Sequence, residues 1–422
     1  MPRLQPRSSL AGIPTMHAST ASTSLRSRPA RLIASSFAFA GLFASSALAH
    51  TFQGIGWLSD ESPSSYASAI SGDGLTVIGQ SYYGPGSDPF TFRWTAADGM
   101  QVVPQLNPEW VYSQPTGVSY DGSVIVGHDY RIEPDPTETG SNIQSFIWTA
   151  GPAATDPGTT TGLPYAGVYY TFSEAYAVSA DGTTVVGMDG GLSPRAYRWT
   201  VGSTTPQLLG PEDTYSEARG VSANGGVIVG EVDGRAFRWV EGSALDDLEI
   251  LSIPDADSSN ASAVSADGTT TVGSFQTQDG IEHAFAWTLG GFVELTALSS
   301  DDYTMTHAHA VSADGHWAVG SSGDYYGTAV LWDTTTGQVW DLNDLFASTL
   351  GFEGWFLQHA TGISADGLTI TGYGLDPDGN DQSWIATLSA HPSSVPEPST
   401  CATLAGVLVL GLVVARRRNH QS

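Results

Sequence analysis

Short apolar runs separated by Gly-rich turns recur along the middle of the chain. In "AVSADGTTVVG", at residues 177–187, apolar positions flank an Asp-Gly pair on both sides, a pattern typical of strand, tight turn and strand. Close variants occur seven times, 43 to 60 residues apart, and this periodicity predicts an architecture built from one repeated unit. The turn residues are Asp73, Asp121, Asp181, Asn224, Asp267, Asp314 and Asp366.

Two further positions recur in register with each turn: a Gly six residues later, and a Trp further on. We expect the Asp-Gly pair to form a type I′ turn with positive φ at both central residues. The later Gly is expected to end the second strand, and the Trp to lie on a third strand with its ring buried between sheets. A fourth, weaker segment follows, such as "PQLLG" at 206–210. The Trp residues are Trp94, Trp148, Trp199, Trp239, Trp287, Trp332 and Trp384.

Four short antiparallel strands per unit predict one blade of a β-propeller, and seven units predict seven blades. The seventh unit has no fourth strand after Trp384, whereas an unassigned segment, Thr51 to Asp60, precedes the first hairpin. We expect this segment to complete the last blade and close the ring, which also removes open sheet edges. The sequence therefore predicts an all-β, seven-bladed propeller over residues 50–390. An open β-solenoid, or a ring of six or eight blades, is the alternative.

Residues 1–49 have the pattern of a secretory signal peptide. Three Arg precede an apolar core, and the small residues at 47–49 form a cleavage site that predicts a mature start at His50. The positive segment is long if Met1 is the true start, so Met16 is an alternative start. The apolar core is too short for the other interpretation, a transmembrane anchor.

Residues 391–422 combine a Pro-Glu-Pro triplet, an apolar stretch long enough for a marginal membrane-spanning helix, and three terminal Arg. This order of parts resembles a PEP-CTERM sorting signal. The resemblance implies transient anchoring in the inner membrane and processing by an exosortase, while the N-terminal cleavage site is expected to be cut by signal peptidase. An ordinary C-terminal anchor is the alternative. The residues that carry the resemblance are Pro396, Glu397, Pro398, Arg416, Arg417 and Arg418.

The unit from Val264 to Thr288, "VSADG…TVG…HAFAWT", resembles the HAF-type extracellular repeat. Only His283-Ala284-Phe285 matches the His-Ala-Phe triplet literally, and Arg195 or Arg235 takes the first position in other units. The resemblance covers about residues 51–388. It implies an exported repeat protein with a propeller-like fold, and it implies no known reaction.

The charge distribution excludes some classes of partner. The chain has no Lys, and residues 50–394 hold seven Arg and 42 acids, a formal charge of −35. This region repels nucleic acid and anionic membrane surfaces, so no nucleic-acid partner is expected. Cations and neutral polymers are compatible partners, although such a charge also serves solubility alone. The single cysteine, Cys401, lies in the C-terminal segment, so we expect no disulfide and no Cys nucleophile after processing.

Aromatic and acidic residues are frequent in the loops that join strands two and three and in those that join successive units. Exposed aromatic rings beside carboxylates suit the apolar and hydroxylated faces of a sugar. They equally suit a protein partner, or packing between blades. The candidate residues from these loops are Trp110, Tyr130 and Trp355.

Varied polar residues alternate with Ala and Gly at the start of each first strand, which predicts a polar funnel near the propeller axis. The histidines in this row lie on two units and have no clear carboxylate or Cys beside them, so we expect hydrogen-bonded histidines rather than a zinc site. The acidic turn Asp376–Asp381 has the oxygen density of a calcium loop but lacks its pattern, and no cofactor is expected. The candidate funnel residues are Glu174, Tyr176, Glu217, Arg219, His307, His309 and His359.

No Gly-x-Ser-x-Gly or His-Glu-x-x-His motif appears in the sequence. We expect a non-catalytic protein exported to the cell envelope, outer surface or extracellular matrix of a Gram-negative bacterium. Its ligand would be an exopolysaccharide or an envelope protein. The alternative is a glycosidase or lyase that uses paired carboxylates such as Glu174 and Glu217.

Overall fold

The computed structural model describes residues 49–82, 84, 88–107, 112–130, 143–152, 156–164, 172–190, 193–299, 304–324 and 326–392. The expected signal peptide, the expected sorting segment and Trp110 lie outside these residues. Among the residues described, no helix has the length and apolar character needed to cross a membrane.

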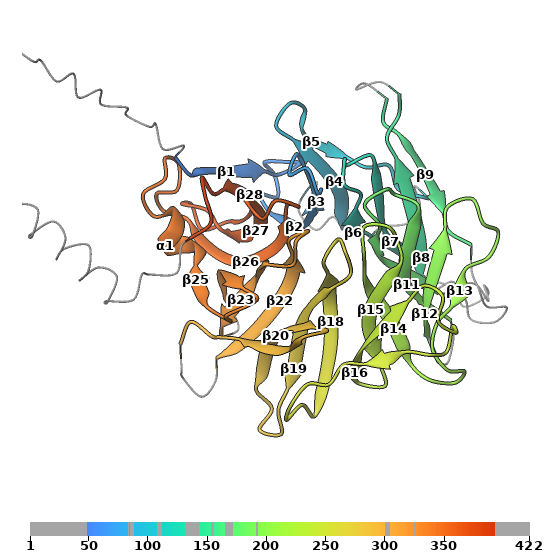
Figure 1. Ribbon diagram of the computed structural model, residues 1–422. Coiled ribbons are helices and arrows are strands. Elements are labelled where there is room, and N and C mark those ends of the chain that lie inside the picture. The colour runs from blue at the N-terminus through green and yellow to red at the C-terminus, as the bar shows by residue number, and fades with distance from the viewer. Residues whose placement is uncertain are drawn as a thin grey trace, which may run out of the picture. The chain divides into compact units, whose positions relative to one another are not determined.

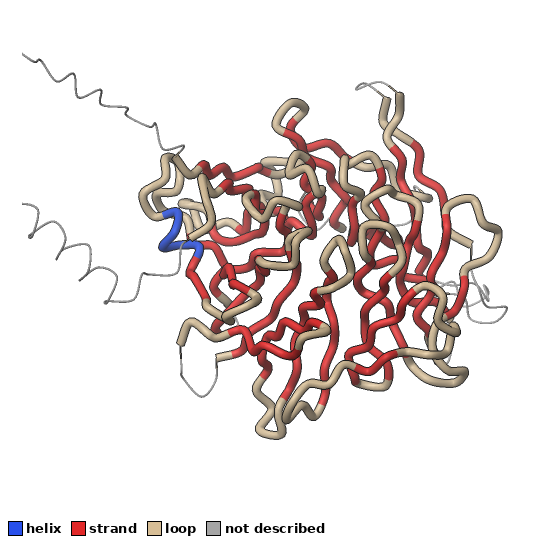
Figure 2. The backbone as a smooth tube through the Cα atoms, viewed as in Figure 1, coloured by secondary structure: helices blue, strands red, loops and turns tan. Residues whose placement is uncertain are grey.

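The described chain forms seven four-stranded antiparallel sheets, and Figure 2 shows that it is almost entirely strand and loop. Each sheet is one blade, with its first strand innermost. Blades 1 to 3 are β2 (Ser65–Ile70), β3 (Thr76–Tyr82), β4 (Pro89–Thr95), β5 (Gly99–Val102); β6 (Tyr112–Val118), β7 (Val124–Tyr130), β8 (Ile143–Thr149), β9 (Thr159–Gly162); and β10 (Ser173–Val178), β11 (Thr184–Asp189), β12 (Arg195–Thr200), β13 (Gln207–Leu208).

The remaining blades follow the same order, and blade 6 is followed by the short helix α1 (Leu342–Phe346). Blades 4 to 6 are β14 (Ser216–Val221), β15 (Val227–Val232), β16 (Arg235–Val240), β17 (Glu249–Ile250); β18 (Ser258–Val264), β19 (Thr270–Gln276), β20 (Glu282–Thr288), β21 (Gly291–Leu295); and β22 (Met305–Val311), β23 (Trp317–Gly323), β24 (Thr328–Asp333), β25 (Val339–Asp341). Blade 7 comprises β26 (Phe356–Ile363), β27 (Thr369–Leu375), β28 (Asp381–Thr387) and β1 (Thr51–Gly56).

The N-terminal strand closes the ring. β1 lies beside β28 (Figure 1) and pairs with it in antiparallel register, with Thr51 opposite Thr387 and Gly54 opposite Trp384. The inner strand of blade 7, β26, in turn contacts β2 of blade 1. The prediction of a seven-bladed propeller closed by its first strand is confirmed, and the open solenoid is excluded.

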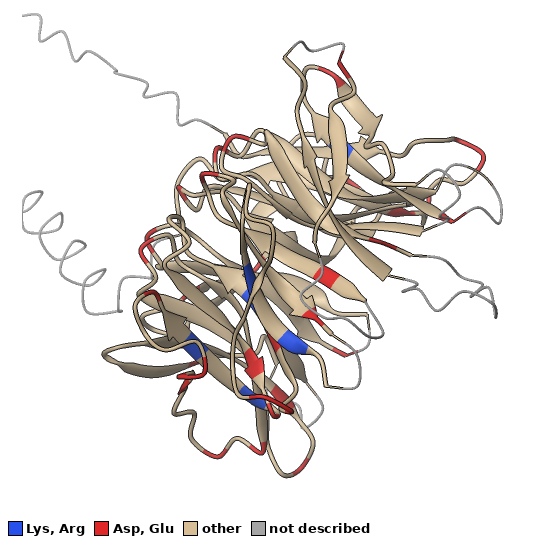
Figure 3. Ribbon diagram, turned by 90° about the vertical axis from the view of Figure 1, so that its right-hand side faces the viewer, with Lys and Arg blue, Asp and Glu red and all other residues tan. Residues whose placement is uncertain are grey.

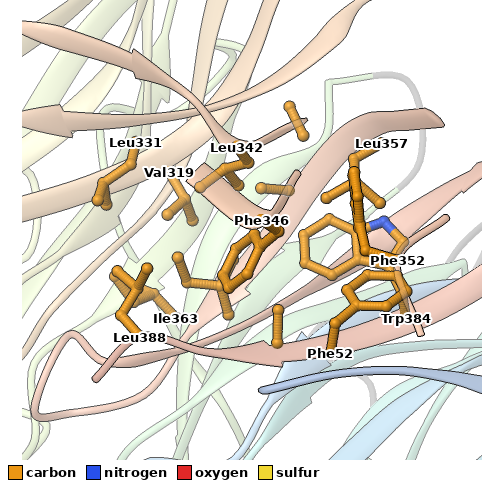
Figure 4. Close-up of a cluster of buried hydrophobic side chains, with 14 residues drawn as sticks. Phe52, Val319, Leu331, Leu342, Phe346, Phe352, Leu357, Ile363, Trp384 and Leu388 are labelled. Atoms are coloured by element: carbon orange, nitrogen blue, oxygen red, sulfur yellow. The ribbon is translucent and has the colours of Figure 1, made fainter. Parts of the chain in front are cut away.

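Apolar side chains fill the spaces between neighbouring blades. The seven recurring Trp are at most 9% exposed, as the repeat predicted. At the closure, Phe52 of β1 packs edge-on against Phe352 with ring centroids 5.0 Å apart, beside the fully buried Phe346 and Trp384 (Figure 4). Burial of such large side chains supplies the main stabilisation of the junction.

The Asp-Gly hairpins do not contain type I′ turns, and that expectation is wrong. Only the Gly of each pair has positive φ, between 69° and 77°, whereas no turn Asp or Asn does. In the first hairpin the Gly74 N–H donates to the Ser71 carbonyl, and the Asp73 carboxylate accepts from the Leu75 N–H at 3.0 Å. The Asp therefore stabilises the turn through its side chain, as in an Asx turn, rather than by adopting a left-handed backbone.

The second recurring Gly lies inside the second strand, not at its end as expected. Gly230 is the fourth residue of β15, and a Cβ there would lie 1.9 Å from the Glu217 carbonyl oxygen of β14. Beside this contact β14 has a register shift between Ala218 and Gly220, so Arg219 is an extra residue in a β-bulge. The corresponding shift occurs in the inner strand of every blade. A glycine at this place accommodates the bulged strand.

Backbone hydrogen bonds of 2.8 to 3.2 Å link the seven hairpin turns to one another around the axis. The inner strands also approach closely near this end, where a Cβ on Gly220 would lie 3.0 Å from the Cα of Ala263. Backbone atoms therefore encircle the axis at what we term the turn end. The residues whose main chains form this ring are Gly72, Asp73, Tyr120, Ala180, Ala223, Ala266, Ala313 and Ala365.

Candidate functional site

The predicted polar row lies at the start of the inner strands, at the end of the axis opposite the turn end. We term this end the mouth. The bulged position of each inner strand belongs to the row, and a bulge changes the direction of a side chain relative to regular alternation. Tyr176, Arg219 and His309 occupy bulges of this kind. The row forms two groups on different blades.

The first group, which we term the arginine cluster, comprises Glu174 and Tyr176 of β10 with Glu217 and Arg219 of β14. The Tyr176 hydroxyl donates to Glu174 Oε2 at 2.6 Å, and Arg219 Nε donates to Glu217 Oε1 at 2.6 Å. The Arg219 guanidinium carbon lies 5.7 Å from the centroid of the Tyr176 ring, a cation–π contact. Glu217 is 2% exposed, whereas the side chain of Arg219 is 44% exposed. A buried carboxylate thus orients a guanidinium that solvent can reach.

Acidic groups outnumber the single Arg of this cluster. Glu231 of β15 is the cross-strand neighbour of Glu217, and burial, followed by the charge of Glu217, raises the pKa of the Glu231 carboxyl. Tyr215 donates its hydroxyl to Glu217 Oε2 at 3.1 Å, and burial together with this carboxylate raises the pKa of Tyr215 to about 12. At neutral pH the arginine cluster is therefore suited to hydroxyl groups or cations more than to anions.

The second group, which we term the histidine cluster, comprises His307 and His309 of β22 and His359 of β26. The His307 and His309 rings are nearly parallel with centroids 6.2 Å apart, and His309 and His359 are 6.4 Å apart. His307 Nδ1 lies 3.2 Å from Glu282 Oε1. Among the described residues no three His, Cys, Asp or Glu side chains converge as metal ligands.

Burial determines the charge of the histidine cluster. It lowers the pKa of His309 to about 4, with further lowering by the charges of His307 and His359. Burial also lowers the pKa of His359. The contact with His307 lowers the pKa of the Glu282 carboxyl. At neutral pH His309 and His359 are therefore uncharged while Glu282 is ionised.

A polar cleft of about 140 Å³ lies between the two clusters, beside blade 5. Its lining includes Glu231, which neighbours the arginine cluster, and Glu282, which contacts the histidine cluster. Asn260 and Ser274 lie between them, with the Asn260 amide donating to the Ser274 hydroxyl at 3.0 Å. The cleft makes the two clusters parts of one continuous polar surface.

A second row of mouth residues, one from the second strand of each blade, was not predicted from the sequence. Each directly follows the recurring Gly and pairs across the strands with a residue of the predicted row, so the variable position after that Gly was the available signal. Tyr373 stacks on His359 at 4.8 Å and meets Tyr66 edge-on at 5.3 Å. The residues of this second row are Gln80, His128, Met188, Glu231, Ser274, Ser321 and Tyr373.

The candidate loop aromatics lie in different surroundings. Tyr130 stacks on Tyr112 at 4.1 Å and on the buried His128 at 6.0 Å, next to the arginine cluster. Trp355 instead packs edge-on against Phe52 at 5.1 Å, within the apolar junction of blade 7, so its contacts are those of a packing residue.

Exposed apolar side chains occur on the two strands that carry the histidine cluster and on the loop beside His359. Met305 and Phe356, which begin β22 and β26, are 44% and 40% exposed, and Tyr326 in the loop after β23 is 65% exposed. Acidic residues occur on many loops of the propeller, whereas the few Arg among the described residues lie on strands (Figure 3). The mouth therefore combines aromatic rings, hydroxyl and amide groups, and carboxylates.

In the acidic turn at residues 376–381, the carboxylate of Asp376 accepts hydrogen bonds from backbone N–H groups of the turn itself. Asp376 Oδ1 accepts hydrogen bonds from the Asp378 N–H at 2.9 Å and the Asn380 N–H at 2.8 Å. These bonds fix the turn before β28, and they are the contacts of an Asx turn.

No protein-family model and no curated protein sequence matches the chain. Solved structures share its fold. An oligogalacturonate lyase from Vibrio parahaemolyticus matches with a TM-score of 0.50 and 9% identity, over 83% of this chain and 98% of that chain. A puromycin hydrolase mutant complexed with PGG matches with a TM-score of 0.52 and 12% identity, over 82% of this chain and 58% of that chain. A putative TolB from Agrobacterium tumefaciens has a TM-score of 0.40 and 16% identity, over 68% and 94%. At such low identity the first two likenesses show the propeller fold alone, and the third adds nothing to it.

Proposed function

We propose that the protein is a non-catalytic propeller, exported to the cell envelope or extracellular matrix, that binds a polysaccharide at the mouth. The observation that carries this proposal is the difference between the two ends of the axis. Backbone hydrogen bonds join the hairpins at the turn end, whereas varied polar side chains gather at the other end. Variation on a repeated scaffold is expected where a ligand is recognised.

The side chains of the mouth have the chemistry that a sugar requires. Tyr326 and Phe356 offer exposed rings to the C–H face of a pyranose, and Asn260 and Ser274 offer hydrogen-bonding groups in the cleft. Export is supported by the signal-peptide pattern, and the PEP-CTERM resemblance supports sorting by an exosortase. Mass spectrometry of the native protein tests both: we expect a mature N-terminus at His50 and loss of the segment after Pro398.

Binding to neutral oligosaccharides and to the matrix polysaccharide of the native organism tests the ligand class. We expect Tyr326→Ala to weaken binding about tenfold, the loss of one aromatic contact. Leu75→Ala is the matched control, because Leu75 is 66% exposed on a hairpin of the turn end. Binding that Leu75→Ala weakens equally would place the site elsewhere. Retention of an envelope protein with no polysaccharide would convert the proposal to a protein-binding role.

A glycosidase or lyase is the second candidate function, favoured by the cross-strand pair of Glu217 and Glu231. Burial, followed by the charge of Glu217, raises the pKa of the Glu231 carboxyl, and a raised pKa beside a second carboxyl group is a property of the general acid in glycoside hydrolysis. The assay is release of new reducing ends or unsaturated products from polysaccharide. Turnover that Glu231→Gln abolishes would establish an enzyme. The same assay with Glu174→Gln tests the other carboxylate of the arginine cluster.

A further inference from the structure

We propose that the histidine cluster is a binding site for the carboxylate group of an acidic sugar, occupied when the imidazoles are protonated. This inference rests on the proposed function, because it assigns a ligand class to one part of the mouth. It starts from a geometric fact: two adjacent inner strands bring three imidazoles together, with centroids 6.2 Å and 6.4 Å apart.

The surroundings of the cluster supply little negative charge. Glu282 Oε1 lies 3.2 Å from His307 Nδ1 and also accepts a hydrogen bond from the Ser274 hydroxyl, and Asp381 accepts a hydrogen bond of 2.8 Å from the Tyr66 hydroxyl. On the other side His359 is covered by the ring of Tyr373. The ionisable groups that face the cluster from neighbouring strands are Glu282 (β20), Tyr373 (β27), Tyr66 (β2) and Asp381 (β28).

Protonation therefore creates a charge that the protein does not balance. Three imidazolium groups carry three positive charges, whereas the facing carboxylates are two, Glu282 and Asp381. Partly buried charges without partners are unfavourable, and an incoming anion relieves this cost. In a protonated imidazole both ring nitrogens are hydrogen-bond donors. A carboxylate fits the cluster because its two oxygens can accept hydrogen bonds from the N–H groups of neighbouring imidazoliums.

The rim of the cluster indicates why the anion belongs to a sugar. Met305 and Phe356 are exposed on the strands that carry the histidines, and Tyr326 is exposed next to Gly327, which lies beside His359. These side chains offer apolar contact to a ring that carries the carboxylate. The formal charge of −35 over residues 50–394 opposes anions at long range, but salt screens charges separated by more than about 8 Å at physiological ionic strength. The local charge of the cluster then decides the binding.

Two tetrasaccharides with the same β-1,4 backbone test the inference: cellotetraose, which is neutral, and its C6-oxidised counterpart tetraglucuronate. Calorimetry of the full chain at pH 7.5 and pH 5.0 measures both affinities. We expect tetraglucuronate to bind about tenfold or more tightly at pH 5.0, with net uptake of protons, because binding and protonation are linked. Cellotetraose should show no such gain.

Substitutions locate the effect. His309→Gln and His359→Gln should each remove most of the gain at pH 5.0, and His307→Gln provides a third variant should either of these fail to fold. His316→Gln is the matched control, because His316 is an exposed histidine on a hairpin of the turn end. Loss of the gain in the first set with its retention in His316→Gln supports the site.

The outcomes separate this inference from the proposed function. If cellotetraose binds at both pH values and tetraglucuronate gains nothing in acid, the inference fails and the proposed function stands. If His309→Gln folds and keeps the full gain, the inference also fails. If neither oligosaccharide binds at either pH, the inference is overturned together with binding of these glycans at the mouth.

Discussion

The turn end and the mouth of the propeller are built from the same seven inner strands, yet different kinds of contact stabilise them. At the turn end the contacts are between backbone groups, with Ala and Gly where strands approach and a closed ring of hydrogen bonds between hairpins. At the mouth the contacts are between side chains. Each inner strand contributes two polar residues there, the bulged residue and the residue two positions before it, such as Arg219 and Glu217, and no two blades have the same pair.

This difference separates the residues that maintain the fold from those that give the protein its individual chemistry. Backbone contacts require the same small residues in each unit, so the sequence repeats there. A ligand that is not seven-fold symmetric requires different side chains on different blades. The arginine cluster on blades 3 and 4 and the histidine cluster on blades 6 and 7 are two such departures from the repeat.

The largest effect on stability is expected from Gly230→Ala. Gly230 lies beside the bulge of β14, between the turn end and the mouth. The new Cβ would lie 1.9 Å from the Glu217 carbonyl oxygen, a backbone atom that cannot move without disrupting the bulge. We expect a loss of about 3 kcal/mol or more in the free energy of unfolding, measured by chemical denaturation. Gly290→Ala is the control, because its nearest neighbour is a Thr288 hydroxyl at 3.4 Å. Equal stability of the two variants would contradict the structural role given to the second recurring Gly.

A somewhat smaller effect on stability, present only at acidic pH, is expected from His309→Gln at the mouth. Because folding lowers the pKa of His309 to about 4 from an ordinary value near 6.5, this group stabilises the fold above pH 6.5 and loses that contribution as the pH falls toward 4. The cost at pH 4 is at most about 3 kcal/mol. The substitution should therefore narrow the difference in melting temperature between pH 7.5 and pH 4.5. A variant with an unchanged difference would show that His309 is already protonated or well solvated.

Asp121 tests the turn end, with an expected effect of about 1 kcal/mol for loss of its hydrogen bonds in Asp121→Ala. Asp121→Asn should keep most of the stability at pH 7, as the natural Asn224 does in blade 4, where its amide oxygen accepts from the Gly226 N–H at 2.9 Å. The hydrogen bonds from Ser123 lower the pKa of Asp121, so its contribution is present above about pH 4 and is lost as the pH falls further. The Asn variant should lack this acid-dependent loss. Denaturation midpoints at pH 7 and pH 3 give the comparison.

The smallest effect on stability is expected at the exposed rim. Tyr326→Ala and Leu75→Ala should each change the free energy of unfolding by less than about 0.5 kcal/mol, because both side chains are largely exposed. A large loss for Tyr326→Ala would mean that this ring supports the fold, and its effect on binding could not then be attributed to ligand contact.

The architecture could be predicted because the number of sequence repeats gives the number of blades, and the landmarks within each repeat mark its strands. Hairpin turns and buried Trp recur seven times, and the surplus segment at Thr51 matches the strand missing after Trp384. The type I′ turn was wrong because Asp-Gly also suits a turn in which Asp acts through its carboxylate and only Gly is left-handed.

The candidate site was predicted in part. The alternation of polar and small residues located one row of the mouth, including Glu217 and His309. It could not reveal the bulge at each inner strand, since a bulge depends on pairing with a partner strand and leaves no mark on one strand alone. The partner residues Glu231 and Tyr373 were missed although each follows the recurring Gly, because their place opposite the predicted row depends on the register of the strand pair. Trp355 was assigned to the loop surface because an aromatic residue in a loop does not reveal that a strand 300 residues away covers it.

The pairing of β1 with β28 sets an order on assembly. Thr51 meets Thr387, so the outermost strand of the last blade is made first and has no partner until almost the whole propeller has been synthesised. At ribosomal rates this wait is roughly 15 to 70 seconds. Throughout that interval the side chain of Phe52 lacks its final neighbours, which all come from residues 319–388, whereas most neighbours of Ile55 belong to blade 1 and are made soon after it. A truncated chain that lacks β28 therefore leaves β1 as an unpaired strand, with Phe52 uncovered.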